Sequence, residues 1–257
     1  MKIAHLPSAF DLTGQTALIT GGGTGLGLGM ARCLVAVGAR VVLVGRREAE
    51  LKKAGIALGE NAHVLAGDIT KLESIPALVE RAEELAGPIS ILVNNAGVHL
   101  KKPALQTSDA EFAHVLQTHV HGAFALTREV GRRMVERRNG CIIFTASMAS
   151  LMGSPLVVAY SAAKSAYRGI VGSLATEWGP HGVRVNAIAP GWIASDMLDL
   201  VLNSDPARKA KILARTPLGR LGEPDDIGWA AVYLASPAGK FVSGVMLPVD
   251  GGAAESF

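Results

Sequence analysis

The chain has 257 residues, of which 49% are hydrophobic and 18% are charged. This balance excludes a disordered chain and is enough for a large buried core. The formal net charge of +3 is too small to indicate a nucleic-acid or membrane partner. The N-terminal stretch is interrupted by Pro7 and has no long apolar core, so it is not typical of a signal peptide, and we expect a cytoplasmic protein. Cys33 and Cys141 lie in apolar surroundings without metal-ligand spacing, which predicts buried reduced thiols and no metal site.

The first part of the chain is typical of a strand, a glycine turn, a helix and a second strand. Residues 15–20 and 40–44 are apolar runs, and residues 28–37 have helical character up to a glycine. In such a βαβ unit, glycines let the backbone approach a pyrophosphate, and the helix N-terminus supplies unpaired N–H groups. The unit therefore predicts a dinucleotide site, with candidate residues Gly21, Gly23, Thr24, Gly25, Leu26 and Gly27.

Strands and helices alternate along the rest of the chain. Further strands are predicted at 63–66, 89–93, 140–145, 183–188 and 244–249, and helices at 71–86, 109–137 and 157–178. Unbroken apolar strands that alternate with helices favour a parallel sheet covered on both faces. We therefore predict a single α/β domain over residues 1–257, a doubly wound Rossmann sheet of seven parallel strands with helices on both faces.

Several polar or turn residues follow the ends of these predicted strands. Ligands of doubly wound sheets bind beyond the carboxyl ends of the strands. Five segments are therefore expected to converge on one crevice, at Gly21, Asp68, Asn95, Ser147 and Pro190.

Residues 145–164 carry the candidate acid–base chemistry. Tyr160 and Lys164 are four residues apart in a predicted helix, so they lie on one face of it. A phenol titrates near a pKa of ~10 in water, and a neighbouring cation favours the phenolate. Ser147 follows a predicted strand and would add a hydroxyl donor. An ordinary helical pair is the competing interpretation, because the YxxxK pattern has only two fixed letters.

Four motifs, TGGGTGLG, NNAG, the set Ser147/Tyr160/Lys164 and PGWIAS, occur in an order and spacing that resemble the short-chain dehydrogenase/reductase family over nearly the whole chain. The resemblance implies that Tyr160 is the general acid/base, that Ser147 holds the substrate oxygen, and that Lys164 binds the nicotinamide ribose and lowers the pKa of the tyrosine. The hydride would pass between the nicotinamide ring and the substrate carbon.

The resemblance also implies the positions of the remaining cofactor contacts. Besides Tyr160 and Lys164 they are Asp68 and Ile69 at the adenine, Asn95, Ala96 and Gly97 at the adenine ribose, and Pro190, Gly191 and Ile193 after the sixth strand, with Ile193 at the nicotinamide amide. For the asparagine loop a strand-ending turn is the alternative interpretation, and for the aspartate a helix N-cap or a buried acceptor.

The chain departs from the family pattern at His119, where members usually carry an asparagine. The family's proton relay runs from the lysine through a water at the backbone carbonyl of that asparagine. A histidine could preserve this path and add a titratable ring, so His119 is included among the catalytic residues. Packing in the core is the alternative interpretation, and a dinucleotide-binding sensor without turnover is the corresponding alternative function.

The choice of cofactor depends on the end of the second strand, where members that prefer NAD tend to carry a carboxylate. Here Gly45 is followed by Arg46 and Arg47, whose planar guanidinium groups suit a phosphate. This predicts NADP (NADPH), with NAD as the alternative. Two features weigh against it: Thr24 stands where many NADP-preferring relatives have a second basic residue, and the arginine pair could be a solvated helix start.

The segments 97–103 and 215–236 are most similar to sugar-acid members of the family, such as gluconate 5-dehydrogenase. The predicted substrate contacts are Ser147, Met148, Tyr160 and Lys101, where Lys101 would pair with a carboxylate and a solvated loop charge is the alternative. A 3-oxoacyl-carrier-protein reductase remains the alternative activity, because it shares much of the second segment. Residues 192–215 are expected to form a lid that orders on cofactor binding. The resemblance also implies a homotetramer built through the long helices and the last strand.

Overall fold

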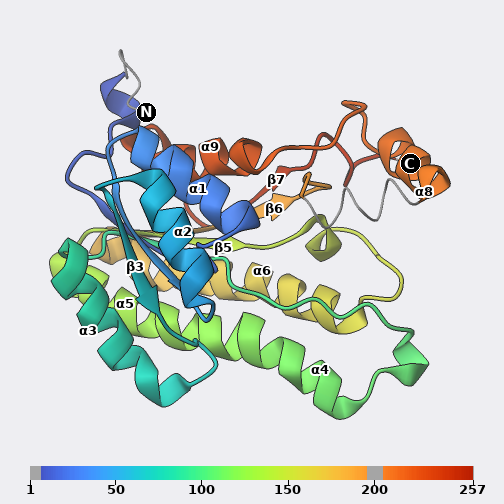
Figure 1. The fold of residues 1–257 in the computed structure, drawn as a ribbon, viewed down its shortest axis with the longest axis horizontal. Coiled ribbons are helices and arrows are strands. Elements are labelled where there is room, and N and C mark those ends of the chain that lie inside the picture. Colours follow the sequence, from blue (N-terminus) through green and yellow to red (C-terminus); the bar gives the residue numbers. More distant parts are fainter. Residues whose placement is uncertain (1–6, 196–204, 257) are drawn as a thin grey trace.

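Seven strands lie side by side in the order β3-β2-β1-β4-β5-β6-β7, and every neighbouring pair is parallel. The computed structural model describes residues 7–195 and 205–256, and this sheet runs through its centre (Figure 1). The strands are β1 Thr16–Thr20, β2 Arg40–Gly45, β3 Ala62–Ala66, β4 Ile91–Asn94, β5 Gly140–Thr145, β6 Val183–Pro190 and β7 Met246–Val249. The predicted doubly wound, seven-stranded fold of a single domain is confirmed.

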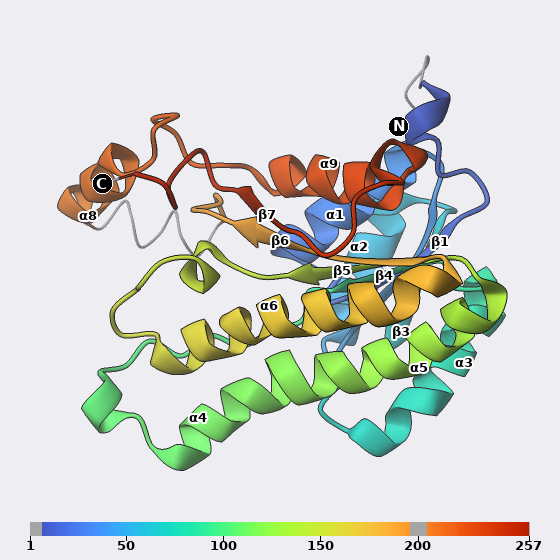
Figure 2. The same cartoon turned by 180° about the vertical axis from the view of Figure 1, so that it is seen from behind.

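Helices cover both faces of the sheet, as Figures 1 and 2 show from opposite sides. One layer consists of α1 Gly25–Ala36, α2 Glu48–Leu58 and α9 Pro224–Ala235, and the other of α3 Ile75–Ala86, α4 Asp109–Leu116, α5 Ala123–Arg137 and α6 Val158–Trp178. Helix α8, Pro206–Ala214, lies apart from both layers (Figure 1). Short 3-10 turns occupy Ser8–Phe10, Leu72–Ser74, Ala104–Gln106, Met148–Ser150, Gly179–His181 and Pro237–Gly239. None of the described helices is both long enough and apolar enough to cross a bilayer.

The sheet separates two apolar cores. Along β5, Ile142 and Phe144 face the core shared with α3, α5 and α6, whereas Cys141 and Ile143 face the core shared with α1 and α9. Side chains alternate between the faces of a strand, so a strand buried on both sides is apolar throughout. Cys33 and Cys141 are buried free thiols, as predicted.

The predicted helical stretch over 109–137 is observed, but it is not α-helical throughout. It begins with a capping box, in which Ser108 and Glu111 bond each other's backbone N–H, and a π-helical segment, Gln117–Gly122, separates α4 from α5. At Gly122 a Cβ would lie 2.6 Å from the carbonyl oxygen of Ile69, so only glycine allows this close approach. Such π segments are frequent at functional sites. The sequence periodicity did not reveal this one.

The strand order places the candidate site. The chain passes from β1 outward to β2 and β3 and then returns to β4 on the other side of β1, so the loops after β1 and β4 leave in opposite directions and open a crevice. Beyond β6, Trp192 and Ala194 form backbone hydrogen bonds with Gly222. The centre of the predicted lid, residues 196–204, lies outside the described residues.

Candidate active site

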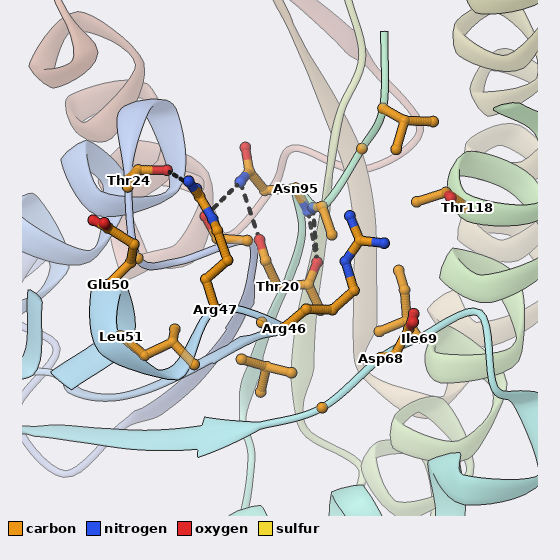
Figure 3. A pocket seen from close by; sticks show the side chains of 18 of the residues that line it. Thr20, Thr24, Arg46, Arg47, Glu50, Leu51, Asp68, Ile69, Asn95 and Thr118 are labelled. Atoms are coloured by element: carbon orange, nitrogen blue, oxygen red, sulfur yellow. Dashed lines mark hydrogen bonds between the residues drawn. The ribbon is translucent and has the colours of Figure 1, made fainter.

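A cavity of about 360 Å³ opens at the carboxyl ends of β1, β2 and β4 (Figure 3). Eleven of the residues predicted to bind a cofactor line it, namely Gly21, Gly23, Thr24, Leu26, Arg46, Arg47, Asp68, Ile69, Asn95, Ala96 and Gly97. Of the five segments predicted to converge, those at Gly21, Asp68 and Asn95 meet at this cavity, whereas Ser147 and Pro190 do not line it.

The glycine turn and the asparagine loop are tied together by hydrogen bonds. The Thr20 hydroxyl accepts from the backbone N–H groups of Asn95 and Ala96, both at 3.0 Å, and the Asn95 side chain donates to the Thr20 carbonyl at 3.0 Å. Gly21 has a φ of +64°, and a Cβ on Gly27 would lie 2.3 Å from the Gly21 carbonyl oxygen. The turn can therefore form only with glycine at these positions, and its open backbone fits a dinucleotide pyrophosphate.

The two arginines after β2 reach different parts of the cavity. Arg47 donates to the Thr24 hydroxyl at 3.0 Å, whereas Arg46 extends toward the side where Asp68 lies (Figure 3). Many NADP-preferring relatives have a basic residue at the position of Thr24. Here Arg47 places its guanidinium group beside Thr24 instead. Glu50 also lines the cavity and adds a carboxylate that the sequence analysis did not identify.

Asp68 is held by its neighbour Thr70. One carboxylate oxygen accepts from the Thr70 backbone N–H at 2.9 Å and from its hydroxyl at 2.8 Å. Burial alone would raise the pKa of Asp68, but these hydrogen bonds and the charge of Arg46 lower it. The Asp68 carboxylate thus acts as a hydrogen-bond acceptor for Thr70, which agrees with the alternative interpretation of a local acceptor. It also lines the cavity, as a cofactor contact would.

Ser147, Tyr160 and Lys164 come together beyond the end of β5. Lys164 is fully buried in α6, donates to the Thr145 carbonyl oxygen, and places its ammonium 5.6 Å from the centre of the Tyr160 ring. The Ser147 hydroxyl accepts from the backbone N–H of Ala149 at 3.1 Å. The segment after β5 and one face of α6 thus bring the three predicted side chains together. Tyr160 and Lys164 are therefore more than an ordinary helical pair, because Ser147 joins them.

The pKa values of this group differ from the sequence expectation. Burial raises the pKa of Tyr160, although a hydrogen bond with Ser147 acts in the opposite direction. Burial also lowers the pKa of Lys164 to about 7. The expected lowering of the tyrosine pKa by the lysine is therefore wrong for this structure, because burial of the phenol outweighs its hydrogen bond with Ser147. Tyr160 is therefore protonated at neutral pH.

His119 lies in the π-helical segment and holds the backbone after the asparagine loop. Its Nε2 is 3.1 Å from the Val98 nitrogen and 2.8 Å from the Val98 oxygen, while its Nδ1 is buried without a partner. A Cβ on Gly97 would lie 2.2 Å from the imidazole, so the ring fills the space beside the loop. The ring also meets Tyr160 edge-on, with centroids 5.5 Å apart.

The imidazole of His119 does not titrate near neutral pH. Burial, followed by the charge of Lys164, lowers its pKa to about 3. The backbone carbonyl of His119, which the family relay would use, accepts a hydrogen bond from the Tyr167 hydroxyl at 2.8 Å. The expectation that the histidine adds a titratable ring is therefore wrong, because the ring is enclosed by protein and next to a cationic group.

His99 is a candidate that the sequence analysis missed. Its ring packs against Tyr160 with centroids 4.9 Å apart and an interplanar angle of 52°. A signal for it is present in the sequence, since His99 follows the NNAG motif by two residues. Lys102 is bound to Glu111 at 2.8 Å, whereas Lys101 is exposed.

Some predicted residues lie outside the cavity. These are Gly25, Gly27, Lys101, His119, Ser147, Met148, Tyr160, Lys164, Pro190, Gly191 and Ile193. Gly191 packs against Asp250, where a Cβ would lie 2.6 Å from its Cα, and Ile193 pairs with Gly222. In residues 7–195 and 205–256, no three His, Cys, Asp or Glu side chains gather as a metal-binding group.

A cavity that fits a dinucleotide, beside a partly buried serine and tyrosine and a buried lysine, defines a nicotinamide-dependent oxidoreductase. A family model described as enoyl-(acyl carrier protein) reductase matches residues 21–254. The chain belongs to the short-chain dehydrogenase/reductase family and acts on CH–OH groups.

Known relatives match this chain over nearly its whole length. Galactitol 2-dehydrogenase (L-tagatose-forming) of Cereibacter sphaeroides is 41% identical, covering 95% of this chain and 97% of the relative. The 2-dehydro-3-deoxy-D-gluconate 5-dehydrogenase of Bacillus subtilis is 38% identical, covering 97% and 98%. A gluconate 5-dehydrogenase from Burkholderia cenocepacia, solved with NADP and tartrate, has a TM-score of 0.92 at 33% identity and covers 97% of this chain and 99% of its own. The predicted similarity to sugar-acid members is confirmed.

Proposed function

We propose that this chain transfers a hydride between NADP(H) and a hydroxy or oxo sugar acid, or a similar polar carbonyl compound, in the manner of gluconate 5-dehydrogenase. The observation that carries the proposal is the position of Ser147, Tyr160 and Lys164 beside a cavity lined by Arg46 and Arg47. The bound cofactor supplies the hydride chemistry at its nicotinamide ring.

The protein's own part of the reaction is proton transfer and orientation. Tyr160, protonated at neutral pH, donates its phenolic proton to the carbonyl oxygen during reduction and takes it back during oxidation. The Ser147 hydroxyl, held by the Ala149 N–H, donates a hydrogen bond to the same substrate oxygen. Lys164 contacts the nicotinamide ribose, and His119 acts by holding the Val98 backbone in place.

Cofactor choice follows from the charges in the cavity. Arg46 and Arg47 offer two guanidinium groups to a 2′-phosphate, and guanidinium–phosphate bonds are among the stronger hydrogen bonds in proteins. Glu50 and Asp68 place two carboxylates in the same cavity, of which Asp68 already accepts two hydrogen bonds from Thr70. The planar guanidinium groups of the arginines suit a phosphate, and a similar solved structure contains NADP. NADP is therefore the proposed cofactor, with NAD as the weaker alternative.

Relatives support a polyhydroxylated substrate. Two of the relatives are named for galactitol and a deoxygluconate derivative, and a solved relative contains tartrate, a hydroxylated dicarboxylic acid. The exposed Lys101 is proposed to pair with the substrate carboxylate, and Met148, directly after Ser147, to contact its carbon chain. Several residues outside the cavity are also proposed to bind the cofactor, in the roles that the family pattern implies. These are Gly25, Gly27, Tyr160, Lys164, Pro190, Gly191 and Ile193.

A substrate panel tests the proposal. Initial rates are measured with 5-ketogluconate, tagatose and a short 3-oxoacyl thioester, each with NADPH and with NADH. We expect the two sugar-derived ketones to be preferred and NADPH to give the higher kcat/KM. Preference for the thioester would instead establish the alternative, a 3-oxoacyl-carrier-protein reductase, which is the name of a 36% identical relative from Rickettsia prowazekii. Cofactor binding without turnover of any of these would establish the sensor.

Exposed apolar side chains support the proposed homotetramer. Phe124 on α5 and Val158 on α6 are 39% and 44% exposed, and Trp229 on α9 is 45% exposed. Contacts with other copies through the α5 and α6 faces and through the region of α9 and β7 would cover them. Light scattering after gel filtration is expected to give the mass of four chains, and a monomeric mass would refute the assembly.

The buried thiols fit the proposed cytoplasmic location, which cell fractionation tests.

A further inference from the structure

His99 lies in a segment that is anchored at both ends. On one side, the Val98 backbone contacts the buried imidazole of His119. On the other, the Lys102 N–H donates to the Leu156 carbonyl at 2.7 Å, and the Lys102 ammonium pairs with Glu111. The anchors come from three different parts of the chain, so His99 occupies a defined position at the crevice.

Two imidazole rings contact the phenol of Tyr160, and they differ in accessibility. His119 is buried and contacts the phenol edge-on, whereas His99 is exposed and contacts it at an interplanar angle of 52°. The Nε2 of His119 is occupied by the Val98 backbone. Of these two rings, His99 is therefore the one that a ligand held by Tyr160 can reach.

The ring nitrogens of His99 are available for hydrogen bonding. Among residues 7–195 and 205–256, no hydrogen bond engages either nitrogen. The surrounding protein atoms, and next the charge of Lys101, lower the pKa of the imidazole. A neutral imidazole offers one donor and one acceptor, and a hydroxyl group can complement both.

We propose that His99 is a specificity-determining residue that hydrogen-bonds a hydroxyl group on the carbon next to the reacting carbon of the substrate. Tyr160 binds the oxygen of the reacting carbon, and His99 packs directly against its ring. The next oxygen along a polyhydroxylated chain is one carbon away, and His99 is the group proposed to bind it. The inference rests on the proposed function. His99 would make the enzyme prefer ketones that carry a neighbouring hydroxyl group over ketones that lack it.

The test compares two ketones that differ only in the neighbouring hydroxyl, 2-hydroxycyclohexanone and cyclohexanone, with NADPH. His99→Phe keeps an aromatic ring against Tyr160 but removes both hydrogen-bonding atoms, and His99→Gln keeps a donor and an acceptor. We expect His99→Phe to lower kcat/KM for the hydroxyketone by roughly 10- to 100-fold. For cyclohexanone the loss should be less than threefold, and His99→Gln should keep most of the preference for the hydroxyketone.

The control is His181→Phe, an exposed histidine in the turn before β6, at the opposite end of the sheet. It should leave both rates within twofold of the wild type. If His99→Phe lowers kcat/KM equally for both ketones, the imidazole acts only through Tyr160. If kcat/KM falls for neither ketone, the imidazole does not contact the substrate. Either result overturns the inference while the wild type still reduces ketones. A wild type that reduces neither ketone nor any sugar-derived ketone would refute the proposed function and the inference together.

Discussion

The two halves of the crevice are built differently. The cofactor half is held by hydrogen bonds between backbone and short side chains, such as those from the asparagine loop to Thr20, and its glycines have no room for a Cβ. The proposed substrate half consists of side chains from segments far apart in the sequence, including His99, Ser147 and Tyr160. Local motifs therefore shape the half proposed to bind the cofactor, whereas packing between distant segments shapes the half proposed to bind the substrate.

Tyr160→Phe should separate the two halves most strongly. It removes the acid/base hydroxyl but leaves the cofactor cavity unchanged, since the tyrosine does not line that cavity. We expect kcat to fall by roughly 10²- to 10⁴-fold. The NADPH dissociation constant, measured by fluorescence titration, should stay within about threefold, and Tyr233→Phe on the exposed side of α9 is the control. Comparable loss of cofactor binding would mean that the halves are not independent.

The double variant Arg46→Leu/Arg47→Leu should damage the cofactor half alone. Loss of charge-assisted hydrogen bonds to a 2′-phosphate is expected to weaken NADPH binding by roughly 10- to 100-fold and to leave NADH binding little changed. Calorimetric titration with both dinucleotides measures this, and Arg81→Leu on the exposed side of α3 is the control. If both dinucleotides weaken equally, the arginines support the glycine turn through Thr24 and do not select a phosphate.

Lys164→Met should show what burial of the active-site lysine costs in stability. Its folded pKa is about 7, against 10.5 when exposed, so between these values the unfolded chain binds more protons than the folded one. The free energy of unfolding of the wild type should therefore rise with pH from about 7 to 10.5, by up to ~1.4 kcal/mol per pH unit.

Urea unfolding at several pH values measures this slope as the difference between the wild type and Lys164→Met. Lys240→Met, at an exposed position, is the matched control and should keep the wild-type slope. Parallel curves for the wild type and Lys164→Met would contradict the lowered pKa of the lysine.

His119→Asn should have the smallest effect. An amide can donate to the Val98 carbonyl and accept from its N–H at once, so kcat/KM should change by less than about threefold. The pH–rate profile between pH 6 and 9 should not move, because His119 has a pKa of about 3. A shifted inflection in that range would show that the imidazole takes part in proton transfer.

The same histidine should affect acid stability. The lowered pKa means that the unfolded chain binds an extra proton between pH 6.5 and about 3, so the wild type should lose stability relative to His119→Asn as the pH falls through this window. His119→Ala, which leaves the Val98 groups without a partner, should be less stable than both at neutral pH.

The sequence by itself determined the fold and the cofactor half. Apolar runs that alternate with helical periods predict a parallel sheet, and glycines at fixed spacing predict the turn, because these signals are local and do not depend on distant contacts. The grouping of Ser147, Tyr160 and Lys164 was also predictable, but through the resemblance of four motifs to the family, because the YxxxK pattern by itself is equally typical of an ordinary helical pair.

Only the tertiary structure decided the rest. The π-helical segment depends on the close approach of Gly122 to Ile69, and the low pKa of His119 depends on its enclosure beside Lys164. The pairing of His99 with Tyr160 joins the loop after β4 to α6. Burial and contacts between distant segments control these properties, and no local pattern of residues encodes them.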